Sequence, residues 1–498
     1  MNISIDELMN QSGVLFGTSG VRGQVTDMTD KVCVAYVAAF IQYLEQEGQL
    51  ARGDKIGIAG DLRSSSPRII KAVAAACTMR GGIPVYFGCI PSPAIALYGI
   101  AHQMPTIMVT GSHIPDDRNG IKFNTVAGEI LKQDEQGIRQ QRVELDDSLF
   151  DQHGYLMELH ELPPVSDAAH ELYVNRYLDF FPELCLQGRH IGLYQHSSVS
   201  REVFATILQK LGARVTILGR SETFVSVDTE AIRPEDTAAA LQWAEQYDFD
   251  CIVSTDGDGD RPLVSDEKGQ WLRGDIVGIL CAAYLQADIV MTPVSCNSAV
   301  EKSHLFSRVG RTKIGSPYVI AAMQQAHRDV PHANIVGYEA NGGFLQLTRI
   351  HRDDRVLSPL PTRDAVIVAL SVMLSAFEHQ LPVSQLVETL PSRYTYSDRL
   401  KQFPTELSQS RLAQFTTGDW HTDSLNIQQA FPSDSKPVLI DNTDGVRVTF
   451  DNEDVIHLRP SGNAPELRCY TESSSSASAR AINQRCMEQM ATWNRQPG

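Results

Sequence analysis

Short apolar runs alternate with helix-forming stretches along most of the chain, and this alternation most constrains the fold. A strand-like run at residues 56–59 is followed by helical apolar spacing from residue 66 and by a second run at residues 85–87. The same order returns after residues 191 and 289. Strands that alternate with helices favour a parallel or mixed sheet covered by helices, so the sequence predicts three similar α/β domains with mixed sheets.

Local signals predict where some of these helices begin and end. Ser66 is predicted to cap the first helix, because Pro67 suits the first helical position, where no backbone N–H is needed. Gly81 and Gly82 predict the end of that helix. Further helices are expected at residues 201–211, 298–306 and 318–327.

The C-terminal part of the chain has a different pattern. Four closely spaced strand signals with tight turns precede a final helix at residues 477–493, which is typical of an α+β domain with a largely antiparallel sheet. A chain of 498 residues has room for three or four domains of about 100–200 residues each. We therefore expect four domains, at residues 1–164, 165–270, 271–382 and 383–498.

The charge and the cysteines limit the class of protein. A formal net charge of −17 repels nucleic acid and anionic membrane surfaces, so neither is expected as a partner. Any site for a sugar phosphate must then supply its own arginine and lysine side chains. Nine cysteines without a C-x-x-C pair are typical of free thiols in a reducing compartment. The N-terminus has no basic segment followed by an apolar one, and no apolar run approaches the roughly 18 residues of a membrane span. We expect a cytoplasmic enzyme.

An acidic loop follows the apolar run at residues 251–253. Asp256, Asp258 and Asp260 alternate with glycine, and carboxylates are the hard oxygen ligands that Mg²⁺ prefers. The glycines let alternate side chains converge on one ion, and such a cluster of negative charge is costly unless a cation neutralises it. The competing interpretation is an EF-hand, because Glu267 stands at the twelfth position of the loop. It is disfavoured by an arginine at the sixth position, where that loop needs glycine, and by the strand that precedes the loop.

A serine loop is the second candidate. Residues 110–115 read Thr-Gly-Ser-His-Ile-Pro, and Lys122 lies ten residues after Ser112. An Asn-Gly pair before the lysine predicts a turn that folds it back over the serine. A lysine beside a phosphoserine neutralises charge and can pass a proton, whereas His113 either contacts the phosphoryl group or only orients the loop. Together the two loops indicate a phosphorylated serine held against a divalent cation, as in a phosphoryl-transfer enzyme.

Two glycine-containing loops complete the candidate sites. At residues 459–465, an arginine, a hydroxyl, an amide and free backbone N–H groups can bind a phosphate, with Arg468 soon after. The alternative for this segment is an ordinary hairpin turn. At residues 337–343, Glu339 and Asn341 are placed to hydrogen-bond sugar hydroxyls, and the alternative is a plain loop.

In their order these segments resemble the α-D-phosphohexomutases, nearly from end to end. The resemblance rests on an opening segment, a phosphoserine loop, a metal loop, a sugar loop and a phosphate loop, at residues 16–23, 110–122, 256–261, 337–342 and 459–465. It implies an isomerase that moves a phosphoryl group between the two ends of a hexose phosphate, through a phosphoserine and a hexose 1,6-bisphosphate. Asn341 with Gly343 is more similar to bacterial members that act on mannose phosphates, with glucose and glucosamine phosphates as the alternatives.

The resemblance also implies a role for each candidate residue. Ser112 would carry the phosphoryl group, and Arg22 and Lys122 would flank it. The implied roles are catalysis for Ser112, Lys122 and Arg22; Mg²⁺ binding for Ser112, Asp256, Asp258 and Asp260; substrate binding for Arg261, Glu339 and Asn341; and phosphate binding for Arg459, Ser461, Gly462, Asn463 and Arg468.

The chain departs from the family pattern at two places. Many members end the sugar loop with serine, glycine and histidine, where this chain has Asn341, Gly342 and Gly343. Many also carry a histidine or aspartate after a Thr-Lys-x-Gly segment, where this chain has Ser316 and Pro317. A candidate base of the third domain is therefore missing, which leaves open the second proton-transfer group. It also leaves open a protein of another class, one that binds a sugar phosphate without turning it over.

Overall fold

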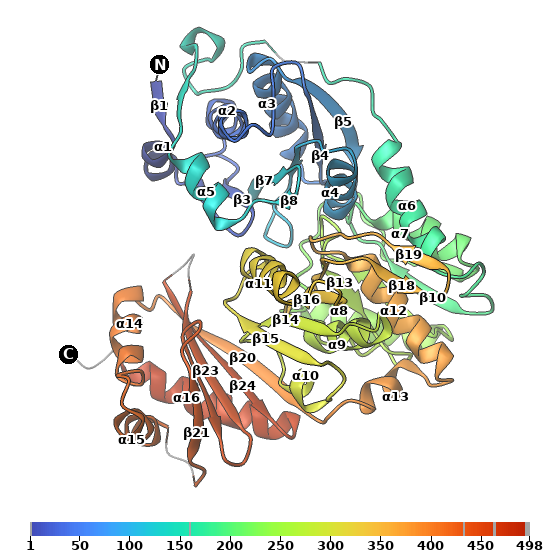
Figure 1. The fold of residues 1–498 in the computed structure, drawn as a ribbon, viewed down its shortest axis with the longest axis vertical. Coiled ribbons are helices and arrows are strands. Elements are labelled where there is room, and N and C mark those ends of the chain that lie inside the picture. The colour runs from blue at the N-terminus through green and yellow to red at the C-terminus, as the bar shows by residue number, and fades with distance from the viewer. Residues whose placement is uncertain (1, 159–160, 432–433, 462–464, 494–498) are drawn as a thin grey trace. The chain divides into compact units, whose positions relative to one another are not determined.

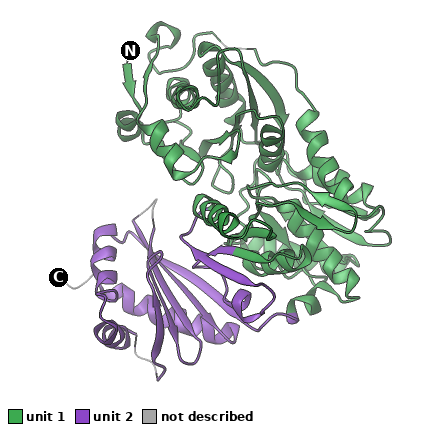
Figure 2. Cartoon of the chain, viewed as in Figure 1, with its two compact units in different colours: residues 1–290, 316–387 green, residues 291–315, 388–498 purple. Residues whose placement is uncertain are grey.

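The computed structural model describes residues 2–158, 161–431, 434–461 and 465–493. The chain forms two compact units, the first of residues 1–290 and 316–387 and the second of residues 291–315 and 388–498 (Figure 2). Strand β14 (Ile289–Pro293) begins in the first unit and ends in the second. Every helix of the described ranges is too short or too polar to cross a bilayer.

The N-terminal sheet of the first unit contains seven strands in the order β2-β3-β7-β6-β4-β5, with β8 paired to β7. Strands β3, β4, β5, β7 and β8 of this sheet are labelled in Figure 1. Strand β4 is parallel to β5 and β6, and the other pairs are antiparallel, so the sheet is mixed as predicted. The strands are β2 (Leu15–Phe16), β3 (Gly20–Gln24), β4 (Lys55–Gly60), β5 (Ile83–Cys89), β6 (Thr106–Val109), β7 (Arg118–Thr125) and β8 (Gly128–Glu129). The accompanying elements are α1 (Ile5–Ser12), α2 (Asp30–Gln46), α3 (Ser66–Met79), α4 (Ser92–Ala101), α5 (Lys132–Arg139) and the strand pair β1 (Asn2–Ser4) and β9 (Arg142–Glu144).

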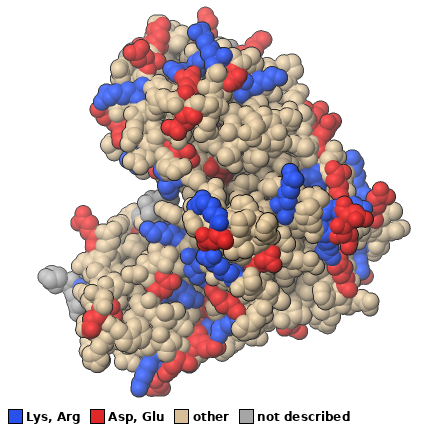
Figure 3. Space-filling model, in the orientation of Figure 1, with Lys and Arg blue, Asp and Glu red and all other residues tan. Residues whose placement is uncertain are grey.

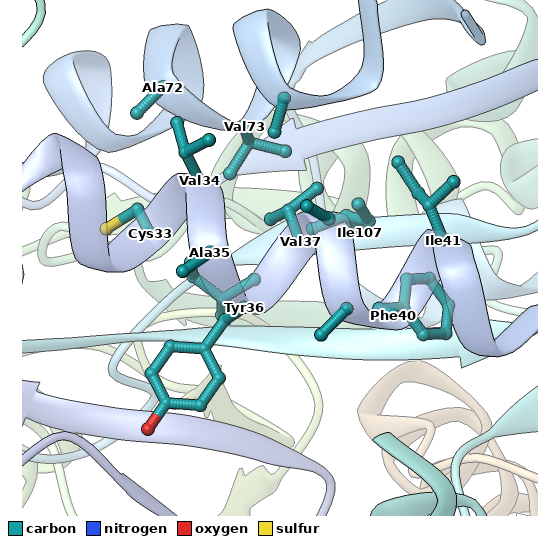
Figure 4. Packing of buried hydrophobic residues seen from close by; sticks show 14 of the residues in the cluster. Cys33, Val34, Ala35, Tyr36, Val37, Phe40, Ile41, Ala72, Val73 and Ile107 are labelled. Atoms are coloured by element: carbon teal, nitrogen blue, oxygen red, sulfur yellow. The ribbon is translucent and has the colours of Figure 1, made fainter. Parts of the chain in front are cut away.

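Helices α2 and α3 pack on this sheet through apolar faces. Val34 and Val37 of α2 lie beside Ala72 and Val73 of α3, with Ile107 of β6 nearby (Figure 4). All five side chains are fully buried, and each valine or isoleucine contributes about 1.5–3 kcal/mol when it leaves water. The sheet that carries the serine loop is therefore held on a continuous apolar core.

The predicted cap of α3 was wrong by one residue. The helix begins at Ser66 itself, and Ser65 precedes it as the N-cap residue. The Ser66 hydroxyl donates instead to Asp61 Oδ1 at 2.5 Å, in a charge-assisted hydrogen bond to a buried carboxylate. The predicted end is confirmed, since the helix stops at Met79 before the two glycines.

A second sheet of the first unit has the strand order β11-β10-β12-β13. Strand β10 is parallel to both β11 and β12, and the short β13 pairs antiparallel with β12. The acidic loop connects β12 to β13. The elements are α6 (Ala168–Phe180), β10 (His190–Tyr194), α7 (Arg201–Lys210), β11 (Arg214–Leu218), α8 (Pro234–Gln246), β12 (Cys251–Thr255) and β13 (Pro262–Val264).

The remaining part of the first unit contains the predicted sugar loop in a hairpin. Strands β16 (Ile335–Tyr338) and β17 (Phe344–Gln346) pair antiparallel around it. The apolar helix α12 (Ala365–Glu378) starts soon afterwards and is buried along most of its length. Other elements are α9 (Gly274–Tyr284), α11 (Ser316–Asp329), β18 (Ile350–Arg352), β19 (Arg355–Leu357) and α13 (Val383–Glu388).

The second unit is an α+β fold with a five-stranded antiparallel sheet in the order β20-β24-β23-β22-β21. Its core contains Phe403, Phe415, Phe431 and Trp493. The sequence did not predict its first strand or two of its helices. The elements are α10 (Ala299–Lys302), β15 (Arg308–Thr312), β20 (Tyr394–Lys401), α14 (Thr405–Ala413), α15 (Trp420–Ala430), β21 (Pro437–Asp441), β22 (Val446–Phe450), β23 (Val455–Pro460), β24 (Glu466–Ser473) and α16 (Ser476–Trp493).

The helix predicted at residues 298–306 is much shorter than expected. It covers only Ala299–Lys302, because the Ser303 hydroxyl bonds to Val300 O and His304 adopts a left-handed φ of 53°. On the face shown in Figure 3, basic and acidic side chains lie among one another, so the negative charge is not gathered in one patch there.

Candidate active site

The serine loop connects β6 to β7, and its residues 110–112 are buried while Pro115 and Asp117 are exposed. Ser112 has a left-handed φ of 55°, and its backbone N–H donates to Thr110 Oγ1 at 2.7 Å. This conformation aims the Ser112 hydroxyl at the acidic loop, where it donates to Asp256 Oδ2 at 2.6 Å. The structure thus brings together two predicted site residues that are 144 positions apart in the chain.

Sequence analysis missed the arginine that shapes this loop. Arg63 is fully buried and donates to the carbonyl oxygens of Ser112 at 2.8 Å and of Pro115 at 2.6 Å, as well as to two others of the loop. Asp61 accepts from Arg63 Nε at 3.1 Å, and Phe224 lies under the guanidinium at 4.1 Å. Five N–H donors in a rigid fork suit arginine to such a set of acceptors. The only signal in the sequence was two charged residues directly after a buried strand.

The acidic loop forms a compact cluster of carboxylates. Asp256, Asp258 and Asp260 are buried, and one oxygen from each lies within 4.8 Å of the others. Lys122 Nζ lies 2.6 Å from Asp258 Oδ2 and 2.7 Å from Asp260 Oδ2. The second oxygens of these two carboxylates are buried without a hydrogen-bond partner in the part of the chain described. Asp260 Oδ1 lies 3.8 Å from Arg261 Nε, which is too far for a hydrogen bond. Buried carboxylate oxygens that lack a hydrogen bond fit a hard divalent cation.

The electrostatics of the cluster agree with a site that needs positive charge. Burial, reinforced by the other two carboxylates, raises the pKa of Asp256 well above its ordinary value. Burial also raises the pKa of Asp258, but the Lys122 ammonium outweighs it, so the net pKa is lowered. For Lys122 burial lowers the pKa, and Asp258 and Asp260 more than offset it, so the lysine remains a cation.

Lys122 reaches the cluster along a strand. The turn predicted at Asn119 and Gly120 was wrong, because both lie inside β7, which pairs with β3 and β6. Asn119 instead donates to the hydroxyl of Ser65 at 2.8 Å, and a side chain at Gly120 would collide with neighbouring backbone. Strand pairing has overridden the local turn preference of an Asn-Gly pair.

Arg22 lies on the neighbouring strand β3. Gly20 is opposite Lys122 in the antiparallel pair, and Arg22 is two residues further along, so it shares the face of Lys122. Burial, followed by the charge of Arg261, lowers the pKa of Arg22 to about 10. His113 is held neutral, because Arg261, burial and Arg22 all lower its pKa. A neutral imidazole with a low pKa is a poor base, which favours the orienting role for His113.

The predicted sugar-binding residues differ in what they contact. Glu339 Oε2 accepts from Arg363 Nε at 2.6 Å, and sequence analysis missed this arginine. The Asn341 amide oxygen accepts from Gly343 N at 2.9 Å, so in this structure it closes its own loop. Arg363 was visible only as a charged residue directly before an apolar helix.

The described start of the predicted phosphate loop, residues 459–461, lies in the second unit and lines a cavity of about 720 Å³. Arg459 and Ser461 line the cavity, and Arg459 Nε forms an ion pair of 2.9 Å with Asp444. Gly462 and Asn463 lie outside the described residues.

Neighbouring strands of the second unit carry a row of arginines. Arg459 of β23 stands opposite Arg468 of β24, and Arg468 stands opposite Arg399 of β20. Like charges directly opposite one another destabilise a sheet unless an anion is near, and here Glu466 lies 3.8 Å from Arg399 and 3.6 Å from Arg468, while Asp444 pairs with Arg459. The row is a concentration of positive charge that a phosphate could share with these carboxylates, and Arg399 is a member that sequence analysis missed.

The EF-hand alternative does not fit the structure. The loop follows β12 and precedes β13, with no helix on either side. Glu267, the twelfth residue, accepts from Ser384 N at 3.1 Å, so its carboxylate belongs to another contact.

Models of four phosphoglucomutase/phosphomannomutase domains match the chain in order. They are the alpha/beta/alpha domains I, II and III and the C-terminal domain, at residues 13–147, 173–269, 273–394 and 419–489. The chain belongs to the phosphoglucomutase/phosphomannomutase family.

Relatives of this family match over almost the full length. The chain is 44% identical to a phosphomannomutase from Salmonella muenchen, with 95% of each chain covered. It is 40% identical to a phosphomannomutase from Sinorhizobium fredii, over 92% of this chain and 95% of that one. A phosphoglucomutase/phosphomannomutase family protein from Burkholderia thailandensis has the same fold, with a TM-score of 0.72 at 19% identity over 98% and 99% of the two chains. The predicted family and four-domain α/β architecture are confirmed.

Proposed function

We propose that this chain is a phosphomannomutase, which interconverts mannose 1-phosphate and mannose 6-phosphate through a phosphoserine enzyme and a hexose 1,6-bisphosphate. The observation that carries the proposal is the Ser112 hydroxyl at 2.6 Å from Asp256, inside a buried carboxylate cluster that also binds Lys122. The choice of mannose is supported by identities of 44% and 40% to two phosphomannomutases. We place the enzyme in the cytoplasm, with no nucleic-acid or membrane partner.

Ser112 is the proposed carrier of the phosphoryl group. The group passes from Ser112 to the free hydroxyl of a hexose phosphate, the bisphosphate reorients, and its other phosphate returns to the serine. Ser112 with Asp256, Asp258 and Asp260 would hold Mg²⁺, which stabilises the negative charge of a phosphoryl group in transfer. Arg63 keeps the attacked serine in one orientation by bonding its carbonyl oxygen.

Lys122 and Arg22 are the proposed charge-stabilising and proton-transfer groups. Lys122 already lies within hydrogen-bond distance of two carboxylates of the cluster, so it can shift to a phosphoserine without leaving the site. Arg261 adds positive charge next to Asp260, at 3.8 Å. Glu339 and Asn341 are the proposed contacts for the sugar hydroxyls.

The loop at residues 459–465 is the proposed binding site of the phosphate that is not reacting. Because the bisphosphate is used in both orientations, this site must hold phosphate from either end of the sugar. Arginine forks do so by charge and geometry, without reading the ring. Arg459, Ser461 and Arg468 would act there with Gly462 and Asn463.

A coupled assay tests the proposal. Mannose 1-phosphate, glucose 1-phosphate and glucosamine 1-phosphate are compared with a catalytic amount of hexose 1,6-bisphosphate, with Mg²⁺ and with EDTA. We expect the highest kcat/KM for mannose 1-phosphate and no turnover with EDTA. A preference for either of the other two sugars would mean that mannose 1-phosphate is not the preferred substrate. Binding of a sugar phosphate without any turnover would mean that the chain is a non-catalytic binding protein.

A further inference from the structure

Both departures from the family pattern lie at one buried charge network in the first unit. At Gly343, where many relatives have histidine, an added Cβ would lie 2.5 Å from Cδ of Arg363 and 2.8 Å from its Cγ. At Ser316, where many have histidine or aspartate, the hydroxyl donates to Glu129 Oε2 at 2.8 Å. The two replaced positions therefore contact an arginine and a glutamate that are themselves 3.8 Å apart.

Arg363 contacts both the sugar loop and the metal loop. Its Nε donates to Glu339 at 2.6 Å, and its Nη1 lies 3.6 Å from Asp260 Oδ2. Its side chain is only 4% exposed, and a buried arginine is stable there only because carboxylates surround it. Burial lowers the pKa of Arg363, but the charges of Glu339, Glu129 and Asp260 raise it by more. The net pKa is above the ordinary value, so the guanidinium remains charged.

Glu129 supports Arg363 from the other side. It ends β8 and accepts from the hydroxyls of Ser316 and Thr362, the residue before Arg363. Burial raises its pKa, whereas Arg363, Lys122 and the two hydroxyls lower it to a net decrease, so Glu129 is a carboxylate. Its charge and its two hydroxyl donors fix the segment from which Arg363 projects.

We propose that Arg363 is a positioning residue for sugar recognition, which fixes the Glu339 carboxylate beside the metal loop and is itself fixed by Glu129. Arg363 occupies the space over Gly343 that a larger residue would take, and it links the proposed sugar contact to Asp260. A sugar hydroxyl bound to Glu339 then stands at a set distance from Ser112, as in-line transfer requires. The inference rests on the proposed function, in which Glu339 binds the sugar.

The first test compares Arg363→Lys with Arg68→Lys. Arg68 pairs with buried Asp30 at 2.5 Å in the same unit and touches no proposed site residue, so its variant is a control for the loss of arginine geometry. A lysine at 363 keeps the charge but has no fork to bond Glu339 and face Asp260 together. We expect kcat/KM to fall roughly 10–100-fold for Arg363→Lys, as for loss of a charge-assisted hydrogen bond, and less than about twofold for the control.

Two readouts separate positioning from a general structural role. The thermal midpoint of the sugar-free protein with saturating Mg²⁺ should change little in either variant, since each lysine keeps the positive charge beside its carboxylates. Mannose 6-phosphate affinity, measured by calorimetry in the Ser112→Ala background, should fall about tenfold for Arg363→Lys alone. Because this binding needs no turnover, it tests Arg363 even if the enzyme proves inactive on mannose phosphates.

The decisive test is a double-mutant cycle with Gly343→Ala. The added methyl must displace Arg363 without changing any charge, so we expect kcat/KM to fall at least fivefold. In the Arg363→Ala background the same methyl should have almost no effect, since nothing is left to displace. The methyl also lies 3.0 Å from Asn341 Oδ1. An effect that acts through Asn341 would be the same with Arg363 present and in the Arg363→Ala background, so the cycle separates it from the effect on Arg363.

Glu129→Gln completes the series. It keeps the size of the side chain and one oxygen acceptor, and it should lower kcat/KM severalfold in the wild type but little in Arg363→Lys. Equal losses from Gly343→Ala with and without Arg363, or Arg363→Lys with wild-type affinity and kcat/KM, would overturn the proposal. In that outcome Arg363 and Glu129 form only a structural ion pair.

Discussion

The serine loop and the acidic loop of the first unit differ in burial from the proposed phosphate-binding region of the second unit. Around Ser112 the groups are buried and bonded to one another, with Lys122 and Asp256 both within 2.7 Å of their partners. Around Arg459 the side chains line a cavity of about 720 Å³, and its ion pair with Asp444 is partly exposed.

On the proposed function, this difference fits a separate part of the reaction for each region. Transfer of a phosphoryl group depends on charges fixed before the substrate arrives, because their reorganisation would add to the barrier. A region that accepts a phosphate from either end of a sugar needs room and charge more than a fixed shape. Substitutions in the first region should therefore affect kcat most, and substitutions in the second should affect affinity.

The largest effect is expected from Ser112→Ala. Without the hydroxyl there is no carrier of the phosphoryl group, and kcat should fall roughly 10⁴-fold or more. Intact-mass measurement should show a phosphoryl group on the active wild type and none on the variant. The control is Ser64→Ala, whose exposed hydroxyl bonds to Asp116 of the same loop and whose turnover should stay within about twofold. A variant at Ser112 with near-normal kcat would exclude the phosphoserine.

The next largest effect is a loss of folding stability at low pH, caused by one buried histidine next to each region. His196 Nε2 donates to Thr255 O next to the acidic loop, and His457 Nε2 donates to Asp444 O behind Arg459. Burial lowers the pKa of each histidine to about 4, since in the described structure Nδ1 is buried without an acceptor for a second proton. A lowered folded-state pKa means that stability is complete above about pH 6.5 and is lost as pH falls toward 4, by roughly 3 kcal/mol per histidine.

Urea unfolding between pH 7.5 and 4.5 measures this loss. His196→Gln and His457→Gln should each remove part of the pH dependence, because glutamine can donate the same hydrogen bond without titrating. Activity and phosphate affinity are measured over the same pH range. If their pH profiles differ, the His196 variant should flatten the profile of activity, and the His457 variant should flatten the profile of phosphate affinity. An unchanged pH dependence in both variants would show that the histidines are not the source.

Arg459→Ala should have a smaller effect, mainly on binding. Loss of a charge-assisted fork to phosphate costs about 1.5–3 kcal/mol, or roughly 10–100-fold in affinity, and Arg459→Lys should recover part of it. Mannose 6-phosphate and mannose are compared as inhibitors, and the alanine variant should lose most of the preference for the phosphorylated sugar. Arg480→Ala, on α16 of the same unit and outside the cavity lining, is the control. An unchanged preference would place the phosphate elsewhere.

Asp444→Asn should have the smallest effect and the opposite sign. Its carboxylate competes with a phosphate for Arg459, and a partly exposed pair of this kind contributes under about 1 kcal/mol. Asparagine keeps an acceptor for the bond from Ile314 N, so the local structure should remain. We expect mannose 6-phosphate to bind up to about fivefold more tightly by calorimetry. Weaker binding would mean that Asp444 aims Arg459 rather than competing for it.

The sequence predicted the site features that neighbouring residues form, and it missed the contacts between residues that are far apart in the chain. The three aspartates of the acidic loop are visible because their spacing alone makes them converge. Arg63 was missed because its bond to Ser112 spans 49 positions and exists only where β4, β6 and β7 meet. The predicted turn before Lys122 failed for the same reason, since pairing with two neighbouring strands outweighs a local preference.

Arg363 and Glu129 show the same limit near the proposed sugar site. Each was an unremarked charge in the chain, and their partners come from α11, the β16–β17 hairpin and the metal loop. The resemblance to a family revealed that two expected residues were absent. It did not reveal what replaces them, because a replacement in space need not be a neighbour in sequence.

If Ser112 carries a phosphoryl group, as proposed, its burial limits the ways in which that group can be acquired. Ser112 is 1% exposed, and Arg63 fixes the backbone of its loop in a left-handed bend. A protein kinase draws its target residue out into its own cleft, and Ser112 cannot follow while Arg63 holds this bend in place. On the proposed function, the phosphoryl group is therefore expected to come from a small phosphorylated metabolite that diffuses into the site, and the phosphorylation state of the enzyme would follow the supply of that metabolite.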